Sequence, residues 1–251
     1  MKLNPAKNTG LRFTDEGQGE PIILLYGLFG SVKNFNPLIQ HLRQSHRVIV
    51  PIFPFYEMGF CVDIFTLTRF LQEVTEELGL DHFHLLGNSM GGHIALLFTL
   101  KYPEKVKSLT LSGSSGLYEH GMGDTYPRRR DYDYIKTKTE MTFYNPEVAT
   151  KELVDEIYAT VNSRKAIQIV SLAKSTIRHN VEKELSSINT PCCLIWGRQD
   201  TITPPEVAES FHRLLPKAEL YWIDECGHVP MLERPEHFNP LLDEFLSKAT
   251  R

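Results

Sequence analysis

The sequence predicts an α/β fold, in which a mostly parallel central sheet is flanked by helices. Short apolar runs of strand length alternate with longer amphipathic segments, which indicates successive βαβ units rather than hairpins. The run Val48–Val50 is apolar without interruption, as expected of a strand that helices cover on both faces. Strand-like runs are missing between residues 113 and 187, so we expect an all-helical insertion there.

The first half of the chain alternates strands and helices. After one or two N-terminal strands, we expect strands at 21–25, 47–51, 83–86 and 107–112. Helices are expected between these strands, at 32–43, 63–78 and 93–100. The second of these helices shows the clearest helical spacing of apolar side chains, at Ile64, Leu67, Phe70, Leu71 and Val74.

The second half contains the insertion and then returns to the alternating pattern. Asn145-Pro146 is a favourable helix start, because proline suits the first turn and Glu147 complements the helix dipole. The helices expected in the insertion lie at 132–143, 146–162 and 164–175. Strands at 192–196 and 219–223, separated by a helix at 204–215, complete the predicted sheet.

The segment Gly87-Asn88-Ser89-Met90-Gly91 matches the G-x-S-x-G pattern and lies between an apolar strand and an apolar helix. In that context the pattern predicts a sharp turn that exposes the serine hydroxyl at the end of the strand. Gly87 and Gly91 allow the strand and the helix to approach closely, and Ser89 must accept an uncommon backbone conformation. Because a helix N-terminus favours negative charge, Ser89 is a candidate nucleophile.

A serine nucleophile needs an imidazole as its base and a carboxylate that orients the imidazole. For a serine on such a turn, the carboxylate and then the histidine follow later in the chain, each just beyond a strand. Asp200 lies in the loop after the strand 192–196, and His228 follows the strand 219–223. The sequence therefore predicts a catalytic triad of Ser89, Asp200 and His228.

Other residues compete for these roles. Asp224 and Glu225 are alternative candidates for the orienting acid, but they end the strand that precedes the histidine and lie on the wrong side of its turn. Asp200 is preferred because it fits the usual chain order. Among the remaining histidines, His120 and His179 fall in the helical insertion, and structural roles are expected for both.

Acyl transfer also needs donors for the negative charge that develops on the carbonyl oxygen, each worth ~3–4 kcal/mol. One donor is expected from the backbone N–H of Met90, the residue after the nucleophile. The other is expected from the loop after the strand 21–25, where Gly27 and Gly30 permit an unusual backbone. Leu28 would present its N–H there, so Leu28 and Met90 form the predicted oxyanion hole.

With these motifs, the sequence resembles the α/β-hydrolase superfamily, in its large group of single-domain, lidded, esterase-like enzymes. The resemblance covers essentially the whole chain and includes the elbow around Ser89, Asp200 at a strand end and the loop of His228. The elbow also resembles that of enzymes that hydrolyse carbon–carbon bonds in ring-cleavage products. One departure is Tyr26-Gly27, where family members usually have His-Gly, and it bears on the support of the oxyanion loop.

The resemblance also implies a division of the chain. Residues 1–112 and 188–251 are expected to form the hydrolase core, and residues 113–187 a helical lid. Such lids line the substrate pocket and control access to it. The candidate substrate contacts of the lid are Tyr118, Met122, Phe143, Tyr158 and Arg178.

The expected function is that of a serine hydrolase that cleaves carboxylic esters of small to medium acyl substrates through an acyl-enzyme intermediate. Haloalkane dehalogenases and epoxide hydrolases share the fold but have a carboxylate where this chain has Ser89. One alternative is a carbon–carbon bond hydrolase of dienoic keto acids. Asn88 and Met90 favour it, whereas Val229 disfavours it because those enzymes usually have tryptophan there. The other alternative, a ligand-binding protein with a residual triad, is supported only by Tyr26.

Composition and charge restrict the partners. The net charge is −4 and the isoelectric point is about 6.2, so nucleic acid and anionic membrane surfaces are not expected as partners. No apolar stretch approaches the ~20 residues of a membrane-spanning helix, and no N-terminal run resembles a signal peptide. The cysteines lack metal-ligand spacing and are expected to be reduced. We therefore expect no metal and no cofactor, a small-molecule ester substrate, a monomer or homodimer, and a cytoplasmic location.

Overall fold

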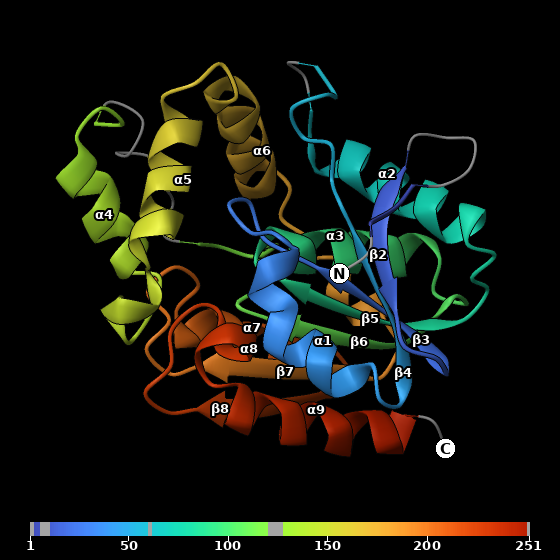
Figure 1. Ribbon diagram of the computed structural model, residues 1–251. Coiled ribbons are helices and arrows are strands. Elements are labelled where there is room, and N and C mark those ends of the chain that lie inside the picture. The colour runs from blue at the N-terminus through green and yellow to red at the C-terminus, as the bar shows by residue number, and fades with distance from the viewer. Residues whose placement is uncertain (1–2, 6–10, 60–61, 120–127, 250–251) are drawn as a thin grey trace.

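Figure 1 shows the computed structural model of the chain, which describes residues 3–5, 11–59, 62–119 and 128–249. Within these residues, one sheet has its strands in the order β1-β2-β4-β3-β5-β6-β7-β8. β2 pairs antiparallel with both β1 and β4, whereas all the other neighbouring strands are parallel. The observed architecture confirms the predicted α/β fold with a mostly parallel sheet flanked by helices.

Each strand expected between residues 21 and 223 is present, with bounds that differ by at most two residues from those expected. The strands are β1 (Leu3–Pro5), β2 (Arg12–Glu16), β3 (Glu20–Leu25), β4 (His46–Pro51), β5 (Phe83–Asn88), β6 (Val106–Ser112), β7 (Cys192–Gly197) and β8 (Ala218–Ile223). The largest difference is in β5, which continues to Asn88 because Gly87 and Asn88 pair with the end of β6. Since Leu25 pairs with Gly87 in the same way, the loops after β3, β5 and β6 begin at one edge of the sheet.

Helices cover both faces of the sheet (Figure 1). α2 packs against α3, while α1 packs against α8 and α9. α3 is buried along most of its length because it lies between the sheet and α2, which explains its nearly uniform apolar sequence. These helices are α1 (Asn36–Leu42), α2 (Ile64–Glu77), α3 (Met90–Lys101), α7 (Pro205–Leu214), α8 (Pro230–Glu233) and α9 (Pro235–Ala249).

The helix expected at 32–43 is divided. Its first turn is a 3-10 helix, η1 (Val32–Phe35), and α1 begins anew at Asn36. Pro37 stands in the first turn of α1, where its missing N–H costs nothing, whereas it would interrupt the hydrogen bonds of one continuous helix.

The regular structure of the described residues between β6 and β7 is helical, as expected for the insertion. Figure 1 shows α4, α5 and α6 grouped beside the sheet. The helix expected at 146–162 is divided, because the side chain of Thr150 accepts a hydrogen bond of 3.3 Å from the N–H of Leu153 and starts a new helix. The elements of this insertion are α4 (Tyr132–Glu140), η2 (Pro146–Val148), α5 (Lys151–Val161), α6 (Ala166–Arg178) and η3 (Leu185–Ser187).

The core lies between the sheet and its helices, and it includes three cysteines. Cys192, Cys193 and Cys226 are buried and free, and Cys61 lies outside the described residues. Burial raises the pKa of the Cys192 thiol to about 12, so this side chain acts as a small apolar group. None of the helices in the described part of the chain combines the length and apolar character needed to cross a membrane.

Candidate active site

Ser89 occupies the turn between β5 and α3 with φ 56° and ψ −124°, a backbone conformation that residues other than glycine rarely adopt. The surrounding backbone fixes this turn: the N–H of Ser89 donates to the carbonyl of Ser112 at 3.1 Å, and its own carbonyl accepts from Gly92 at 2.9 Å. A Cβ atom at Gly91 would lie 2.1 Å from the carbonyl oxygen of Leu25, so only glycine fits there. The elbow that the sequence predicts is therefore present.

Asp200 and His228 are in direct contact. Oδ2 of Asp200 lies 2.8 Å from Nδ1 of His228, although the two residues are separated by α7 and β8 in the sequence. Oδ1 of Asp200 accepts hydrogen bonds from the N–H groups of Ile202 at 2.8 Å and Thr203 at 3.0 Å. The hydroxyl of Thr203 donates to Oδ2 at 2.8 Å, so each oxygen of this buried carboxylate has two partners. These bonds fix the plane in which the carboxylate meets the imidazole.

The other two carboxylates considered as the orienting acid lie elsewhere. Asp224 pairs with Arg198 at 2.7 Å, and Glu225 pairs with Arg234 at 2.9 Å. Both are largely exposed, with 77% and 65% of their side-chain surface accessible, whereas the side chain of Asp200 is 0% exposed.

The pKa of His228 is raised above its ordinary value of 6.5. Burial acts to lower this pKa, because it disfavours the charged imidazolium, but the charge and hydrogen bond of Asp200 outweigh burial, and Glu119 adds to them. The environment of His228 therefore stabilises a proton on the ring, as a base that must hold a transferred proton requires.

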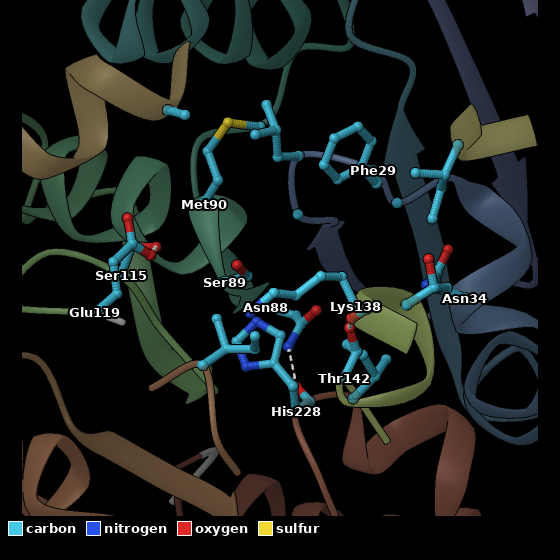
Figure 2. A pocket seen from close by; sticks show the side chains of 18 of the residues that line it. Phe29, Asn34, Asn88, Ser89, Met90, Ser115, Glu119, Lys138, Thr142 and His228 are labelled. Carbon is cyan, nitrogen blue, oxygen red and sulfur yellow. Dashed lines mark hydrogen bonds between the residues drawn. The ribbon is translucent and has the colours of Figure 1, made fainter. Parts of the chain in front are cut away.

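Ser89 and His228 line one cavity of about 220 Å³ (Figure 2). Asn88 connects the two residues, since its side-chain amide donates to the carbonyl oxygens of Ser112 at 2.9 Å and His228 at 3.0 Å. Gly113 lies against the imidazole with φ 53°, and a Cβ atom there would be 2.8 Å from Nδ1 of His228. The elbow, the end of β6 and the histidine loop are therefore in close contact with one another.

Leu28 and Met90, the predicted oxyanion donors, both line this cavity. Gly27 brings the first of these loops close to the serine, because a Cβ atom at Gly27 would lie 2.9 Å from Cβ of Ser89. The loop turns tightly, with the N–H of Gly30 donating to the carbonyl of Gly27 at 3.0 Å.

Tyr26 supports this loop in place of the usual histidine. Its hydroxyl oxygen accepts a hydrogen bond of 2.9 Å from the N–H of Phe53, and its ring packs edge-on against Phe53 and Phe55. Burial raises the pKa of Tyr26 to about 12, so the phenol stays neutral. Tyr26, which stands where family members usually have histidine, is therefore held by contacts of its own with Phe53 and Phe55.

The insertion supplies most of the apolar wall of the cavity. Of the expected substrate contacts, Phe143 lines the cavity. Tyr118, Tyr158 and Arg178 do not: Tyr118 is 47% exposed, the hydroxyl of Tyr158 donates to the carbonyl of Arg130 at 3.1 Å, and Arg178 is exposed at the end of α6. Met122 lies outside the described residues. The side chains from α4, α5 and α6 that do form the wall are Ile135, Lys138, Thr139, Leu153, Ile157, Val161, Ala173, Thr176 and Ile177.

The difference between the expected and the observed lining residues has a physical origin. The expected contacts were large or aromatic residues, but the side chains that face the cavity from α5 and α6 are those on one stripe of each helix, such as Ile157 and Val161. Tyr158 is next to Ile157 and therefore points about 100° away from it.

Two polar residues of the site were not expected from the sequence. The signal for Thr203, which holds Asp200, is its position three residues after the acid, because an aspartate side chain in a turn commonly accepts from the backbone that follows it. Glu119, which lines the cavity, belongs to no motif.

The other histidines considered do not line the cavity. His93 is buried in α3, and the ring of His179 lies edge-on against Phe65 with their centroids 4.4 Å apart. His120 is outside the described residues. Among the residues that are described, no group of three or more histidine, cysteine, aspartate or glutamate side chains is suited to hold a metal ion.

Comparisons with known proteins identify the family to which the chain belongs. Residues 20–166 and 117–235 match the family described as alpha/beta hydrolase fold. The chain is 29% identical to Lipase 1 of Psychrobacter immobilis over 234 residues, which cover 86% of this chain and 73% of the lipase. It is 30% identical over 195 residues to a 2-hydroxy-6-oxononadienedioate/2-hydroxy-6-oxononatrienedioate hydrolase of Paraburkholderia phymatum, covering 72% of this chain and 67% of that enzyme.

Solved structures show the same similarity. An α/β-hydrolase enzyme from the metagenome of sediments of the lagoon of Mar Chica, Morocco, is 39% identical, with a TM-score of 0.82 and full coverage of both chains. A meta-cleavage product hydrolase of Pseudomonas fluorescens is 21% identical and shares the fold, with a TM-score of 0.86 and coverage of 99% and 98% of the two chains. The strand order, the elbow and the match over most of the sequence place this chain in the α/β-hydrolase fold family.

Proposed function

We propose that this protein is a serine hydrolase that cleaves carboxylic esters of small to medium acyl substrates through an acyl-enzyme intermediate. The observation that carries this proposal is the pair Asp200–His228, at 2.8 Å, beside a cavity that also contains Ser89 on its strained turn. Two relatives are named as lipases, which supports an ester substrate. A third is named as a hydrolase of a different bond, so hydrolysis is the activity that these names share.

In the proposed reaction, Oγ of Ser89 attacks the ester carbonyl carbon while Nε2 of His228 accepts the serine proton. Asp200 holds the imidazole through Nδ1 and stabilises its charged form. The tetrahedral intermediate collapses as His228 returns the proton to the leaving alcohol, which leaves the acyl group on Ser89. Water, deprotonated by the same histidine, then attacks the acyl carbonyl and releases the acid.

The negative charge of each tetrahedral intermediate lies on the former carbonyl oxygen. We propose that the backbone N–H groups of Leu28 and Met90 bind this oxygen, since both residues line the cavity beside Ser89. Met90 is also the first residue of α3, so the helix dipole adds to the stabilisation.

We propose that residues 113–187 form the lid of this site. Side chains of α4, α5 and α6 make up one wall of the cavity, which is the position of a lid over the substrate site. The cavity volume of about 220 Å³ lies below the ~300–1,000 Å³ of most small-molecule sites, which favours small to medium acyl groups.

A second candidate is carbon–carbon bond hydrolysis of dienoic keto acids. Relatives with 25–30% identity carry names of this activity, and Asn88 and Met90 fit it. Lys138 provides a cation on the cavity wall, and a cation there favours a substrate that carries a carboxylate. The alternative of a ligand-binding protein without turnover depended on Tyr26. The hydroxyl of Tyr26 accepts a hydrogen bond from the N–H of Phe53, so this residue has a structural role and does not favour that alternative.

Hydrolysis of p-nitrophenyl esters, from acetate to decanoate, by the wild type and by Ser89→Ala tests the proposal. We expect turnover by the wild type with an optimum at short to medium chains, and loss of about 10³-fold or more in the variant. The same two proteins are then assayed with a 2-hydroxy-6-oxo-dienoate. Turnover of the dienoate alone would replace the ester proposal with the second candidate.

A further inference from the structure

Glu119 is the one carboxylate among the described residues that line the Ser89 cavity. It follows β6, near the start of the insertion, and both of its oxygens are held. Oε2 accepts a hydrogen bond from the hydroxyl of Ser115 and Oε1 accepts one from Thr176 in α6, each at 2.8 Å. Ser115 and Thr176 also line the cavity, so the carboxylate is fixed at the wall where substrate binds.

The charge of Glu119 is not neutralised by the part of the chain that the structure describes. None of the described lysine or arginine side chains forms an ion pair with it. The cavity has a largely apolar lining, which includes Met90 and Ala173. Glu119 is half-buried, so water screens its charge less than that of an exposed side chain.

The reacting atoms are within reach of this charge. Glu119 is one of the groups that raise the pKa of His228, so its field extends to the imidazole. Figure 2 shows Glu119 and Ser115 on one side of Ser89, and Lys138 and Thr142 on the other. The ammonium group of Lys138 lies 5.9 Å from the centroid of the Tyr134 ring, and Lys138 is exposed, so water screens it more than Glu119.

We propose that Glu119 determines the charge selectivity of the site: esters with a cationic group near the ester bond are preferred, and esters with a carboxylate there are rejected. This inference rests on the proposed ester hydrolysis at Ser89. A carboxylate brought beside Glu119 loses its water and meets a like charge, whereas a quaternary ammonium group gains an opposite charge. The substrate class is therefore neutral to cationic esters rather than the anionic dienoates.

Two sets of isosteric esters test this selectivity by pH-stat titration, and each set contains a cation, a neutral analogue and a carboxylate. The first carries the charge on the alcohol side, as in butyrylcholine, 3,3-dimethylbutyl butyrate and 2-carboxyethyl butyrate. The second carries it on the acyl side, as in the methyl esters of 4-(trimethylammonio)butyrate, 5,5-dimethylhexanoate and glutarate. We expect the wild type to prefer the cationic ester over the carboxylate by at least about tenfold in kcat/KM in one set.

Glu119→Gln keeps the size of the side chain and removes its charge. We expect this variant to reduce the cation-to-carboxylate ratio by about tenfold, and Lys138→Gln to raise the same ratio. Because ratios are compared within each protein, a general loss of activity cancels. A wild type without preference in either set, or a ratio that both variants change in the same direction, would overturn the inference.

Binding measured without turnover separates this inference from the proposed function. Calorimetry of hexylammonium and hexanoate with Ser89→Ala is compared with the same titrations of Ser89→Ala combined with Glu119→Gln. We expect hexylammonium to bind less tightly by about tenfold when Glu119 is replaced. If that loss occurs and no ester is hydrolysed, the ester proposal fails, and what remains is a preference of the cavity for cationic ligands that depends on Glu119. If esters are hydrolysed and Glu119→Gln changes neither the binding nor the ratios, the selectivity fails and the ester proposal holds.

Discussion

The backbone N–H of His228 donates a hydrogen bond of 2.9 Å to the carbonyl oxygen of Thr142, which follows α4 in the helical insertion. The carbonyl of the same histidine accepts from Asn88 of the elbow at 3.0 Å. The hydroxyl of Thr201, next to Asp200, donates to the carbonyl of Met141 at 2.9 Å. The insertion is therefore bonded to both loops that carry the predicted acid and base, and a displacement of residues 141–145 would move His228.

Glu233 strengthens this connection, and its replacement by glutamine should lower kcat. Its Oε1 accepts the N–H of Asn145 at 2.7 Å and its Oε2 accepts the N–H of Gly227 at 2.6 Å, so one carboxylate ties the insertion to the histidine loop. Glutamine has a single acceptor oxygen, so one of the two N–H groups loses its charged acceptor, and hydrogen bonds to charged groups contribute ~1.5–3 kcal/mol. We expect a decrease in kcat of about tenfold with a smaller change in KM.

Glu236→Gln is the matched control for this prediction. Glu236 is an exposed neighbour whose carboxylate pairs with Arg234 only at 3.9 Å. Steady-state kinetics and thermal melts of the two variants should differ clearly. Equal effects on kcat would mean that Glu233 does not position the histidine.

The rate should depend on pH through His228. The imidazole acts as a base only when neutral, and its pKa is raised above 6.5, because Asp200 and Glu119 outweigh the opposing effect of burial. We therefore expect kcat/KM to rise with pH along a limb whose apparent pKa lies above 6.5. Glu119→Gln removes one of the charges that raise the pKa, so its limb should move to lower pH. A wild-type limb below 6.5, or a movement to higher pH in the variant, would contradict this assignment.

Thr203→Val tests the support of the acid. The Thr203 hydroxyl is fully buried and donates to Oδ2 of Asp200, the oxygen that also contacts His228. Hydrogen bonds to charged groups contribute ~1.5–3 kcal/mol, so the variant should lose at least about tenfold in kcat/KM. Thr137→Val is the control, because Thr137 is exposed and its hydroxyl donates to the carbonyl of Asp133 in its own helix. Similar kinetics for the two variants would show that the Asp200 carboxylate needs no hydroxyl partner.

The fold and the positions of the predicted triad could be read from the sequence because both depend on local signals. Buried parallel strands leave continuous apolar runs, and a nucleophile on a strained turn requires small residues at fixed spacing, as at Gly87 and Gly91. Asp200 and His228 follow because parallel strands end at the same edge of the sheet.

The cavity wall could not be read in the same way. Which side chains of α5 and α6 face Ser89 depends on how the insertion packs over the sheet, and neither helix carries a motif for it. Glu119 is an example: its placement depends on Ser115 in the core and Thr176 in the insertion, which are 61 positions apart in the chain. Such a contact is a property of the tertiary structure and leaves no local pattern.

His93 should make the protein sensitive to acid. It is fully buried in α3, neither ring nitrogen has a hydrogen-bond partner among the described residues, and burial, with a smaller contribution from His179, lowers its pKa to about 4. The unfolded chain binds a proton at this residue near pH 6.5, whereas the folded protein does so only near pH 4. Between these values the unfolded state holds more protons, so stability falls as the pH falls, by up to ~3 kcal/mol from this residue.

His93→Leu removes this titration and fills the site with an apolar side chain of similar size. Urea unfolding between pH 7 and pH 4 should therefore show a shallower loss of stability for the variant than for the wild type. His237→Gln, at a residue with 63% of its side-chain surface exposed, should leave the slope unchanged. If the wild type and His93→Leu lose stability in parallel over this range, protonation of His93 does not cause the acid sensitivity, and the ring must have a partner when it is charged.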